Sequence, residues 1–127
     1  MLRVRTHIKQ SEIKGAGLGL FTSQPIKKGD VIYIFDEGLE LEFMTPKNLA
    51  VHDLSIVEYC TKYGYSHRNR IRVPLDENKY MNHSTEPNVL DNGDKAIAMH
   101  DISEGQELTC NYANLGPTRE DLEFNLL

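Results

Sequence analysis

Tyr80-Met81-Asn82-His83-Ser84-Thr85-Glu86-Pro87-Asn88 is the stretch of this sequence on which the fold depends. It is dense in side chains that hydrogen-bond in two directions, it holds a proline flanked by turn-forming residues, and it lies between two apolar, strand-like runs. Asn and Ser side chains compete with the backbone for its hydrogen bonds, so the stretch suits neither a strand interior nor a helix. We therefore predict a loop that the surrounding fold holds for a purpose.

Two further blocks stand on either side of this stretch. Near the start lies Gly15-Ala16-Gly17-Leu18-Gly19, which runs into Leu20-Phe21, and close behind lies Gly105-Gln106-Glu107-Leu108-Thr109-Cys110-Asn111-Tyr112. Three glycines within five residues permit backbone angles and close approaches that other residues resist. The spacing matches neither the phosphate-binding loop nor the dinucleotide-binding fingerprint. Taken alone, the glycine cluster favours a plain turn over a ligand-binding loop.

The composition is that of one compact domain spanning residues 1–127, with 39% hydrophobic and 26% charged residues. The longest apolar runs are far too short to cross a bilayer, and the first residues lack the apolar core of a signal peptide. The two cysteines, Cys60 and Cys110, indicate reduced thiols, so we expect an intracellular protein, cytoplasmic or, in a eukaryote, nuclear. The net charge of −5 argues against a nucleic-acid-binding face and mildly favours a cationic partner.

Alternating and β-branched segments between turn-forming residues predict a β-rich domain of many short strands with minor helix. Residues 54–65 are ambiguous between helix and strand, and we favour a strand around residues 56–59. Short helices are expected over about 46–52, where Thr45-Pro46 has N-cap and first-turn chemistry, and after Thr118. The expected strands cover residues 2–9, 31–35, 39–43, 56–59, 69–74, 95–100 and 107–112.

The Asn82-His83-Ser84 cluster has three interpretations: half of a catalytic dyad, a ligand contact, or structural hydrogen bonding. A hydrolase that uses Ser84 and His83 would also need an orienting acid and an oxyanion element, and the sequence gives no independent support for them. A metal site is not predicted either, because His67, His83 and His100 lie far apart without an acid or a cysteine at ligand spacing. The residues alone therefore favour structural hydrogen bonding.

Tyr112 closes the last apolar strand. A tyrosine at a strand end is usually packed, with its hydroxyl bonded to a polar partner. A phenol could orient an amine nucleophile, but an ordinary pKa of about 10 makes it a weak base at neutral pH. By itself the position favours packing.

Taken together, the three blocks, in this order and at this spacing, resemble the SET-domain methyltransferases over roughly residues 3–115, with residues 113–127 as a C-terminal tail. The Asn-His-Ser-x-x-Pro-Asn pattern is highly specific, whereas the glycine block would be weak without it. The resemblance implies a mainly β, β-clip-like fold of small curved sheets and short helices. In this fold the last strand segment threads under a loop as a pseudoknot, an exception to the usual avoidance of threaded loops.

The resemblance also implies a function: transfer of a methyl group from S-adenosylmethionine to a lysine of a protein substrate, such as a histone tail or another basic protein. Neither nucleic acid nor a membrane is expected as a partner, and the chain would be a monomer or a homodimer. Tyr112 would be the catalytic residue, acting first through orientation and electrostatics. The substrate channel would include Phe35, Tyr59 and Cys110. The cofactor-binding residues would be Ala16, Gly17, Leu18, Tyr80, Asn82 and His83.

The sequence departs from the family pattern at several positions. Cys110 stands where the family often has an aromatic residue that tunes how many methyl groups are added, and Phe35 stands where many relatives carry tyrosine. The tail 113–127 contains no cysteine, so a zinc-bound C-terminal module is not expected. The alternative is a catalytically inactive SET-like protein-binding module. The joint presence of Asn82, Tyr112 and the glycine loop favours activity.

Overall fold

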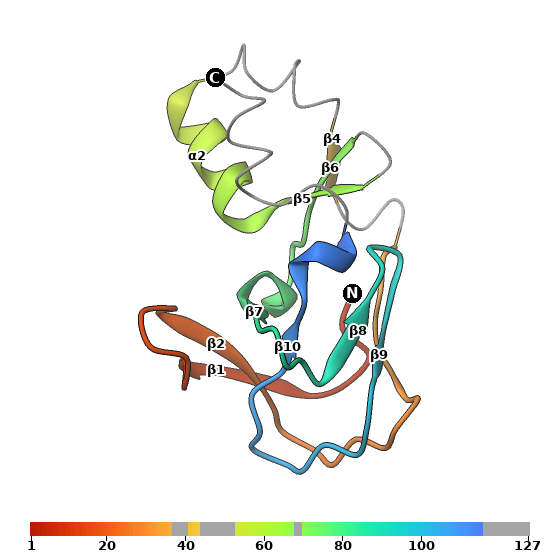
Figure 1. Ribbon diagram of the computed structural model, residues 1–127. Coiled ribbons are helices and arrows are strands. Elements are labelled where there is room, and N and C mark those ends of the chain that lie inside the picture. The colour runs from red at the N-terminus through yellow and green to blue at the C-terminus, as the bar shows by residue number, and fades with distance from the viewer. Residues whose placement is uncertain (37–40, 44–52, 68–69, 116–127) are drawn as a thin grey trace.

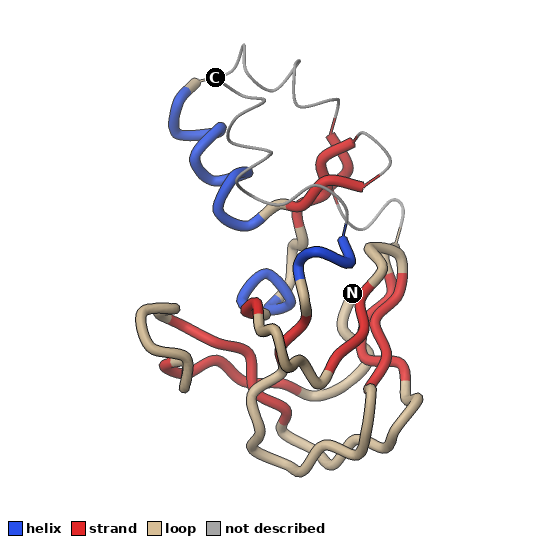
Figure 2. The backbone as a smooth tube through the Cα atoms, in the orientation of Figure 1, coloured by secondary structure: helices blue, strands red, loops and turns tan. Residues whose placement is uncertain are grey.

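The computed structural model describes residues 1–36, 41–43, 53–67 and 70–115. Short strands and loops make up most of this part of the chain, as Figure 2 shows. The elements, labelled in Figure 1, are β1 (Thr6–Gln10), β2 (Leu18–Thr22), β3 (Val31–Ile34), β4 (Leu41–Phe43), α2 (Leu54–Tyr63), β5 (Tyr65–His67), β6 (Arg70–Val73), the 3₁₀-helix η1 (Glu77–Tyr80), β7 (Asn82–His83), β8 (Val89–Asp91), β9 (Lys95–Ala98), β10 (Thr109–Cys110) and the 3₁₀-helix η2 (Tyr112–Leu115).

The central sheet has the strand order β3-β9-β8-β10-β7. β10 runs parallel to both of its neighbours. Its Cys110 pairs with His83 of β7 on one side and with Val89 of β8 on the other. Since β7 and β8 follow each other in the sequence, the loop that joins them crosses β10, and the C-terminal strand threads beneath it. The mainly β fold with a C-terminal pseudoknot, predicted from the sequence, is therefore confirmed.

The hairpin of β1 and β2 carries the glycine cluster at its turn (Figure 1). Its register pairs Thr6 with Thr22 and Gln10 with Leu18. β2 is also tied to the C-terminal block, because the Leu108 amide donates to the Leu20 carbonyl at 2.8 Å and Phe21 bridges to Glu107. The first and last blocks of the sequence motif therefore lie side by side.

The expected strand over residues 56–59 is wrong, because residues 54–63 form helix α2. Val57, Cys60 and Tyr63, spaced three residues apart, lie on one face of the helix and pack against Ile71 and Val73 of β6. This burial against the β4-β6-β5 sheet decides the helix. A local preference for strand is overridden when helical spacing presents the apolar side chains to a neighbouring sheet.

The main core lies between the central sheet and the β1-β2 hairpin and contains fully buried Leu20, Ile32, Val89, Ala96 and Leu108. Burying such side chains contributes roughly 1.5–3 kcal/mol each relative to exposure. Both cysteines are buried, and burial raises the pKa of the Cys60 thiol. Neither thiol is therefore placed as a reactive nucleophile.

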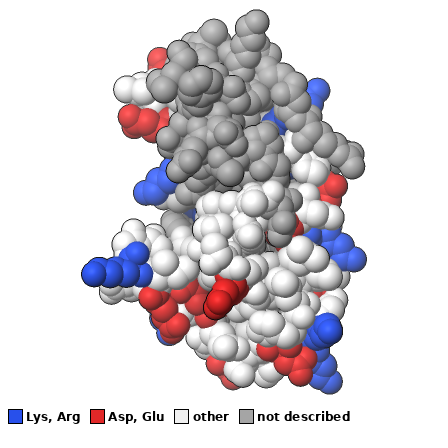
Figure 3. Space-filling model, in the orientation of Figure 1, with Lys and Arg blue, Asp and Glu red and all other residues white. Residues whose placement is uncertain are grey.

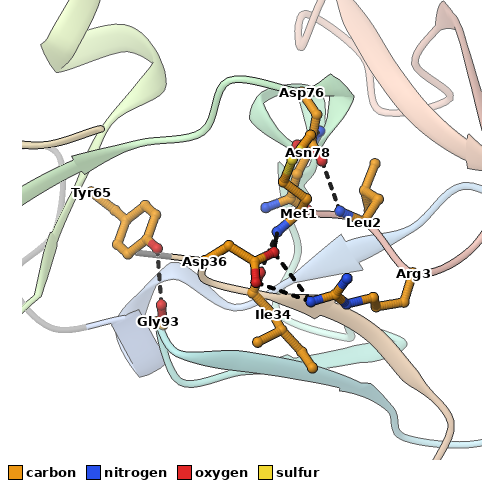
Figure 4. A network of polar contacts seen from close by, with 9 residues as sticks. All are labelled: Met1, Leu2, Arg3, Ile34, Asp36, Tyr65, Asp76, Asn78 and Gly93. Carbon is orange, nitrogen blue, oxygen red and sulfur yellow. Dashed lines mark hydrogen bonds and ion pairs between the residues drawn. The ribbon is translucent and has the colours of Figure 1, made fainter. Parts of the chain in front are cut away.

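The N-terminal residues connect β3 with the segment that precedes the Asn-His-Ser loop, as Figure 4 shows. Arg3 donates to both carboxylate oxygens of Asp36 at 3.1 Å, and the Met1 amine also contacts Asp36. The Leu2 amide donates to Asp76 at 2.7 Å, and Asp76 also accepts from the Asn78 amide at 3.1 Å as the N-cap of η1. These bonds fix the start of η1, which carries Tyr80 toward the site.

Other strand predictions agree with the structure in place but not in length. The segments expected at 2–9, 31–35, 39–43, 69–74 and 95–100 correspond to β1, β3, β4, β6 and β9, and the last strand is reduced to β10. Three short strands, β2, β5 and β8, were not expected, and Asn82–His83 form β7 inside the predicted loop. The helices expected over 46–52 and after Thr118 lie outside the described residues.

In the described part of the chain, no helix is long and apolar enough to cross a membrane. Acidic and basic side chains are interspersed over the face drawn in Figure 3, around a largely uncharged middle.

Candidate functional site

A pocket of about 150 Å³ lies between the glycine loop, the Asn-His-Ser segment, η1 and α2. Five of the six residues expected to bind a cofactor line it, although they come from two blocks of sequence more than sixty residues apart. The sixth, His83, is not among its lining residues. The lining consists of Ala16, Gly17, Leu18, Lys62, Tyr63, Lys79, Tyr80 and Asn82.

Two glycines of the loop beside this pocket adopt backbone angles that other residues rarely take. Gly15 and Gly17 have φ angles of +82° and +75°, in the region that side chains rarely adopt. A Cβ atom added at either position would meet nothing within 4 Å, so these glycines are required by their backbone angles and not by crowding. The Ser11 amide closes the loop by donating to the Gly17 carbonyl at 2.8 Å.

Asn82 joins the middle block of the motif to the other two. Its Nδ2 donates to the Leu18 carbonyl at 3.0 Å and to Oε2 of Glu107 at 3.3 Å. Glu107 is 9% exposed and also accepts from the Ser11 hydroxyl and the Glu12 amide. Glu107 was not singled out in the sequence, where only its place in the third block could have drawn attention to it.

Two lysines and two tyrosines, Lys62, Lys79, Tyr63 and Tyr80, form the wall of the pocket that α2 and η1 share, and Tyr59 lies behind them in contact with Lys79. The Nζ atom of Lys79 lies 5.3 to 5.7 Å from the ring centroids of Tyr59, Tyr63 and Tyr80, within cation–π range. It donates to the Tyr59 hydroxyl at 3.2 Å, and this hydrogen bond raises the pKa of Lys79. Lys62, over the Tyr63 ring at 5.1 Å, adds a second positive charge.

Tyr112 is connected to the Asn-His-Ser segment through both its side chain and its backbone. Its hydroxyl donates to the Met81 carbonyl at 2.8 Å, and its amide donates to Nδ1 of His83 at 3.1 Å. The His83 and Tyr112 rings lie 5.2 Å apart. Because its amide bonds to the histidine, Tyr112 begins η2 and does not continue the expected strand.

Asn88, the last residue of the Asn-His-Ser-x-x-Pro-Asn pattern, fastens the pseudoknot. Its Nδ2 donates to the Glu107 carbonyl at 2.8 Å, and its Oδ1 accepts from the Thr109 amide at 2.9 Å. The side-chain amide thus imitates the backbone of a paired strand beside the threaded segment. These two bonds explain why an asparagine, with both a donor and an acceptor on its side chain, directly follows Pro87.

His83 and Ser84 are engaged with separate partners. His83 Nδ1 accepts from Tyr112, whereas the Ser84 hydroxyl accepts from the Glu86 amide at 3.0 Å. Among the described residues, no group of three His, Cys, Asp or Glu side chains is arranged to hold a metal ion. The geometry offers no support for the hydrolase interpretation.

The three residues expected along a substrate channel are distributed over two regions. Phe35 and Cys110 both belong to the main core cluster, and the guanidinium of Arg72 stacks on the Phe35 ring at 3.6 Å. Arg72 also donates to the Gly93 carbonyl at 2.9 Å and to Asp94 at 2.7 Å. Tyr59 lies instead on α2, where its hydroxyl accepts from Lys79, a residue that lines the pocket.

Comparison with known proteins identifies the family. The family model described as the SET domain matches residues 17–113, most of the chain, including the second and third blocks of the motif and the first block from Gly17 onward. The chain therefore belongs to the SET-domain family, and the resemblance read from its sequence is confirmed. Among curated protein sequences, no relative matches it.

Solved structures share the fold at low sequence identity. A structure of Polycomb Repressive Complex 2 from Chaetomium thermophilum bound to GSK126 matches with a TM-score of 0.70 at 20% identity, over 95% of this chain and 17% of the other. The complex ctPRC2 bound to S-adenosylmethionine matches with a TM-score of 0.67 at 20% identity, over 95% and 16%. A candidate histone methyltransferase of Plasmodium falciparum matches with a TM-score of 0.59 at 22% identity, over 87% and 95%. The chain thus spans about a sixth of the Polycomb chains.

Proposed function

We propose that this protein is an S-adenosylmethionine-dependent protein-lysine N-methyltransferase. The observation that carries the proposal is the pocket, where Ala16, Gly17, Leu18, Tyr80 and Asn82 meet although they lie far apart in the sequence. Membership of the SET-domain family and the S-adenosylmethionine-bound structural neighbour support the same ligand.

The donor groups of the pocket fit this cofactor. The open backbone of the glycine loop offers peptide groups to a polar ligand, and Lys62 and Lys79 offer positive charge to a carboxylate. Asn82 has both N–H groups engaged inside the protein, so its amide oxygen is left to accept a hydrogen bond from an ammonium. When bound, the cofactor supplies a methyl group on a sulfonium, which is electrophilic without help from a metal.

The acceptor lysine sets the harder chemical requirement. A lysine has an ordinary pKa of about 10.4 and is protonated at neutral pH, so the site must favour its neutral form. Desolvation among apolar and aromatic side chains does this, and Phe35 and Cys110 are the candidates for that wall. The Tyr112 hydroxyl, held by the Met81 carbonyl, would orient the amine, with general-base action a lesser role.

The acceptor is proposed to be a lysine in a basic protein segment, with a histone tail as one candidate. The chain's net charge of −5 suits a basic substrate. The Plasmodium neighbour, described as a histone methyltransferase, supports histones as the substrate class, and the Polycomb complex supports a setting among other proteins; we propose an intracellular location on the same grounds. We propose action on protein rather than on nucleic acid for the same electrostatic reason.

The test is a calorimetric titration with S-adenosylmethionine of the wild type and of the variant Asn82→Ala, followed by transfer of a labelled methyl group to histones and basic peptides. We expect one site in the wild type and a binding loss of at least about tenfold in Asn82→Ala, because the variant removes the amide that joins the three blocks. Asn92→Ala, at the exposed β8-β9 turn, is the matched control and should bind as the wild type does.

The two stages separate the possible outcomes. Binding without transfer to any substrate would leave the fold and cofactor in place and favour the inactive protein-binding module. Absence of cofactor binding in the wild type, with and without candidate peptides, would overturn the enzyme proposal.

A further inference from the structure

We propose that Glu107 is a positioning residue of this pocket: its buried carboxylate sets the orientation of the Asn82 amide and the position of the glycine loop. The inference rests on the proposed function for its effect on cofactor binding. The orientation of the Asn82 amide, in contrast, is a property of the ligand-free protein and can be measured without the cofactor.

The carboxylate is anchored first at the base of the glycine loop. Ser11 Oγ donates to Oε2 at 2.7 Å and lies 3.0 Å from Oε1, and the Glu12 amide donates to Oε1 at 2.9 Å. The Ser11 amide in turn closes the loop onto the Gly17 carbonyl. Glu107 therefore holds Ser11, the residue whose backbone closes the loop that lines the pocket.

The same carboxylate reaches Asn82. Oε2 accepts from Nδ2 of Asn82 at 3.3 Å, while the second N–H of that amide donates to the Leu18 carbonyl at 3.0 Å. An asparagine amide can be turned over to exchange its oxygen and nitrogen, and its partners decide which way it faces. With two acceptors on its nitrogen side, Asn82 is fixed with its oxygen available to the ligand.

The backbone of β2 is shaped to admit this carboxylate. A Cβ atom added at Gly19 would lie 2.5 Å from Oε2 of Glu107 and 3.2 Å from the Cα atom of Ser11. Gly19 is therefore required because a side chain there would collide with Glu107, whereas Gly15 and Gly17 are required by their backbone angles. Gly19 allows an ionisable group to lie against the strand directly behind Leu18, a wall of the pocket.

Only an acceptor-only group meets these demands. Three donors, from Ser11, Glu12 and Asn82, converge on two oxygens. A glutamine would keep one acceptor for the Glu12 amide but would turn an NH₂ group toward the NH₂ of Asn82. Ser11 would adapt, because a hydroxyl can also accept, whereas Asn82 would have to turn over and lose its bond to Leu18.

The test uses the full chain and the variants Glu107→Gln and, as the matched control, Glu104→Gln, which makes the same change at an exposed glutamate outside the pocket. The Asn82 side-chain NH₂ signals in the NMR spectrum of the ligand-free protein should shift in Glu107→Gln and stay near their wild-type position in Glu104→Gln. The dissociation constant for S-adenosylmethionine, by calorimetry, should rise about tenfold in Glu107→Gln and less than about twofold in Glu104→Gln. Thermal melts verify that each variant is folded.

Gly19→Ala is the second probe of the same carboxylate, since it displaces Glu107 without changing its chemistry. It should move the Asn82 signals and weaken binding in the same direction, and it decides the matter if Glu107→Gln does not fold. If the Asn82 signals shift but the wild type binds no cofactor, the positioning role stands and the proposed function fails. Unmoved Asn82 signals in a folded Glu107→Gln, or equal binding losses in Glu107→Gln and Glu104→Gln, would overturn the inference.

Discussion

The Tyr112 hydroxyl donates a hydrogen bond to the backbone carbonyl of Met81 at 2.8 Å. Met81 directly precedes Asn82, which lines the pocket, so this bond joins the proposed catalytic side chain to the proposed cofactor site across the pseudoknot. The bond uses the phenol's O–H as a donor, so toward an amine or a methyl group the same oxygen would act as an acceptor.

Replacing this hydroxyl should separate catalysis from binding. We expect Tyr112→Phe to lower methyl transfer on the order of 100-fold, because an orienting dipole is lost, while the dissociation constant of S-adenosylmethionine stays the same. The measurement is initial-rate transfer of labelled methyl beside calorimetry. Tyr65→Phe is the matched control, since the Tyr65 hydroxyl also donates to a backbone carbonyl, that of Gly93, at 2.9 Å, away from the pocket. Both variants should lose about 1 kcal/mol of stability. Equal rates in Tyr112→Phe and wild type would remove Tyr112 from the mechanism.

The lysine wall of the pocket should contribute to affinity through charge. Lys79→Met should weaken S-adenosylmethionine binding about tenfold, because an ammonium that can pair with the cofactor carboxylate is removed. The loss should shrink as salt is raised. An analogue of the cofactor without the carboxylate should bind Lys79→Met and wild type equally, which separates charge pairing from damage to the Tyr59 contact. Lys95→Met, an exposed change on β9, is the control and should have no effect.

Asp91 should make the stability of the fold depend on pH. Burial, with the nearby Asp94 carboxylate, raises the pKa of Asp91 from 3.8 to about 6, against the opposing bond from the Gly93 amide. Because the folded chain holds this proton more tightly than the unfolded chain, the free energy of unfolding falls as pH rises from about 4 to about 6 and is then level. The shift corresponds to about 3 kcal/mol as an upper bound.

Asp91→Asn removes the charge and keeps an oxygen for the Gly93 amide, so it should unfold at a higher temperature at pH 7 and lose the pH dependence. Thermal melts between pH 4 and pH 7.5 check this. Asp101→Asn, at an exposed turn, is the control and should follow the wild-type profile. A difference between Asp91→Asn and wild type that shrinks toward pH 7 would contradict the assignment.

Arg72 should be more important to stability than other paired arginines. It stacks on Phe35 and donates to Gly93 and Asp94, with a side chain only 8% exposed. A lysine cannot reproduce a planar fork that stacks and bonds at once, so Arg72→Lys should cost about 2 kcal/mol in urea unfolding. Arg3→Lys changes an arginine that is 44% exposed in its pair with Asp36, and it should cost less than about 1 kcal/mol. Equal losses in the two variants would contradict the predicted role of burial.

Several secondary-structure elements were predictable from the sequence alone. The Val31–Ile34 strand and the Lys95–Ala98 strand were predicted because β-branched residues between turn formers have few alternatives. The region 54–63 was predicted incorrectly, since its apolar residues serve either element until Ile71 and Val73 supply the surface that selects a helix. Strands as short as β7 and β10 carry no local signal, because their pairing is decided by the threading itself.

The sequence by itself determined the family, the fold class and five of the residues that line the pocket, because a specific motif and backbone requirements such as positive φ at Gly17 are written locally. The tertiary structure decided which residues meet. Three contacts show this: Glu107 accepts from Asn82, Asn88 bonds to the threaded strand, and Lys79 lies beside the tyrosine rings of α2. In each case the separation of the two segments in the sequence does not predict their separation in space. Such long-range pairs depend on how the sheets close, and closure is a property of the whole core rather than of any single stretch.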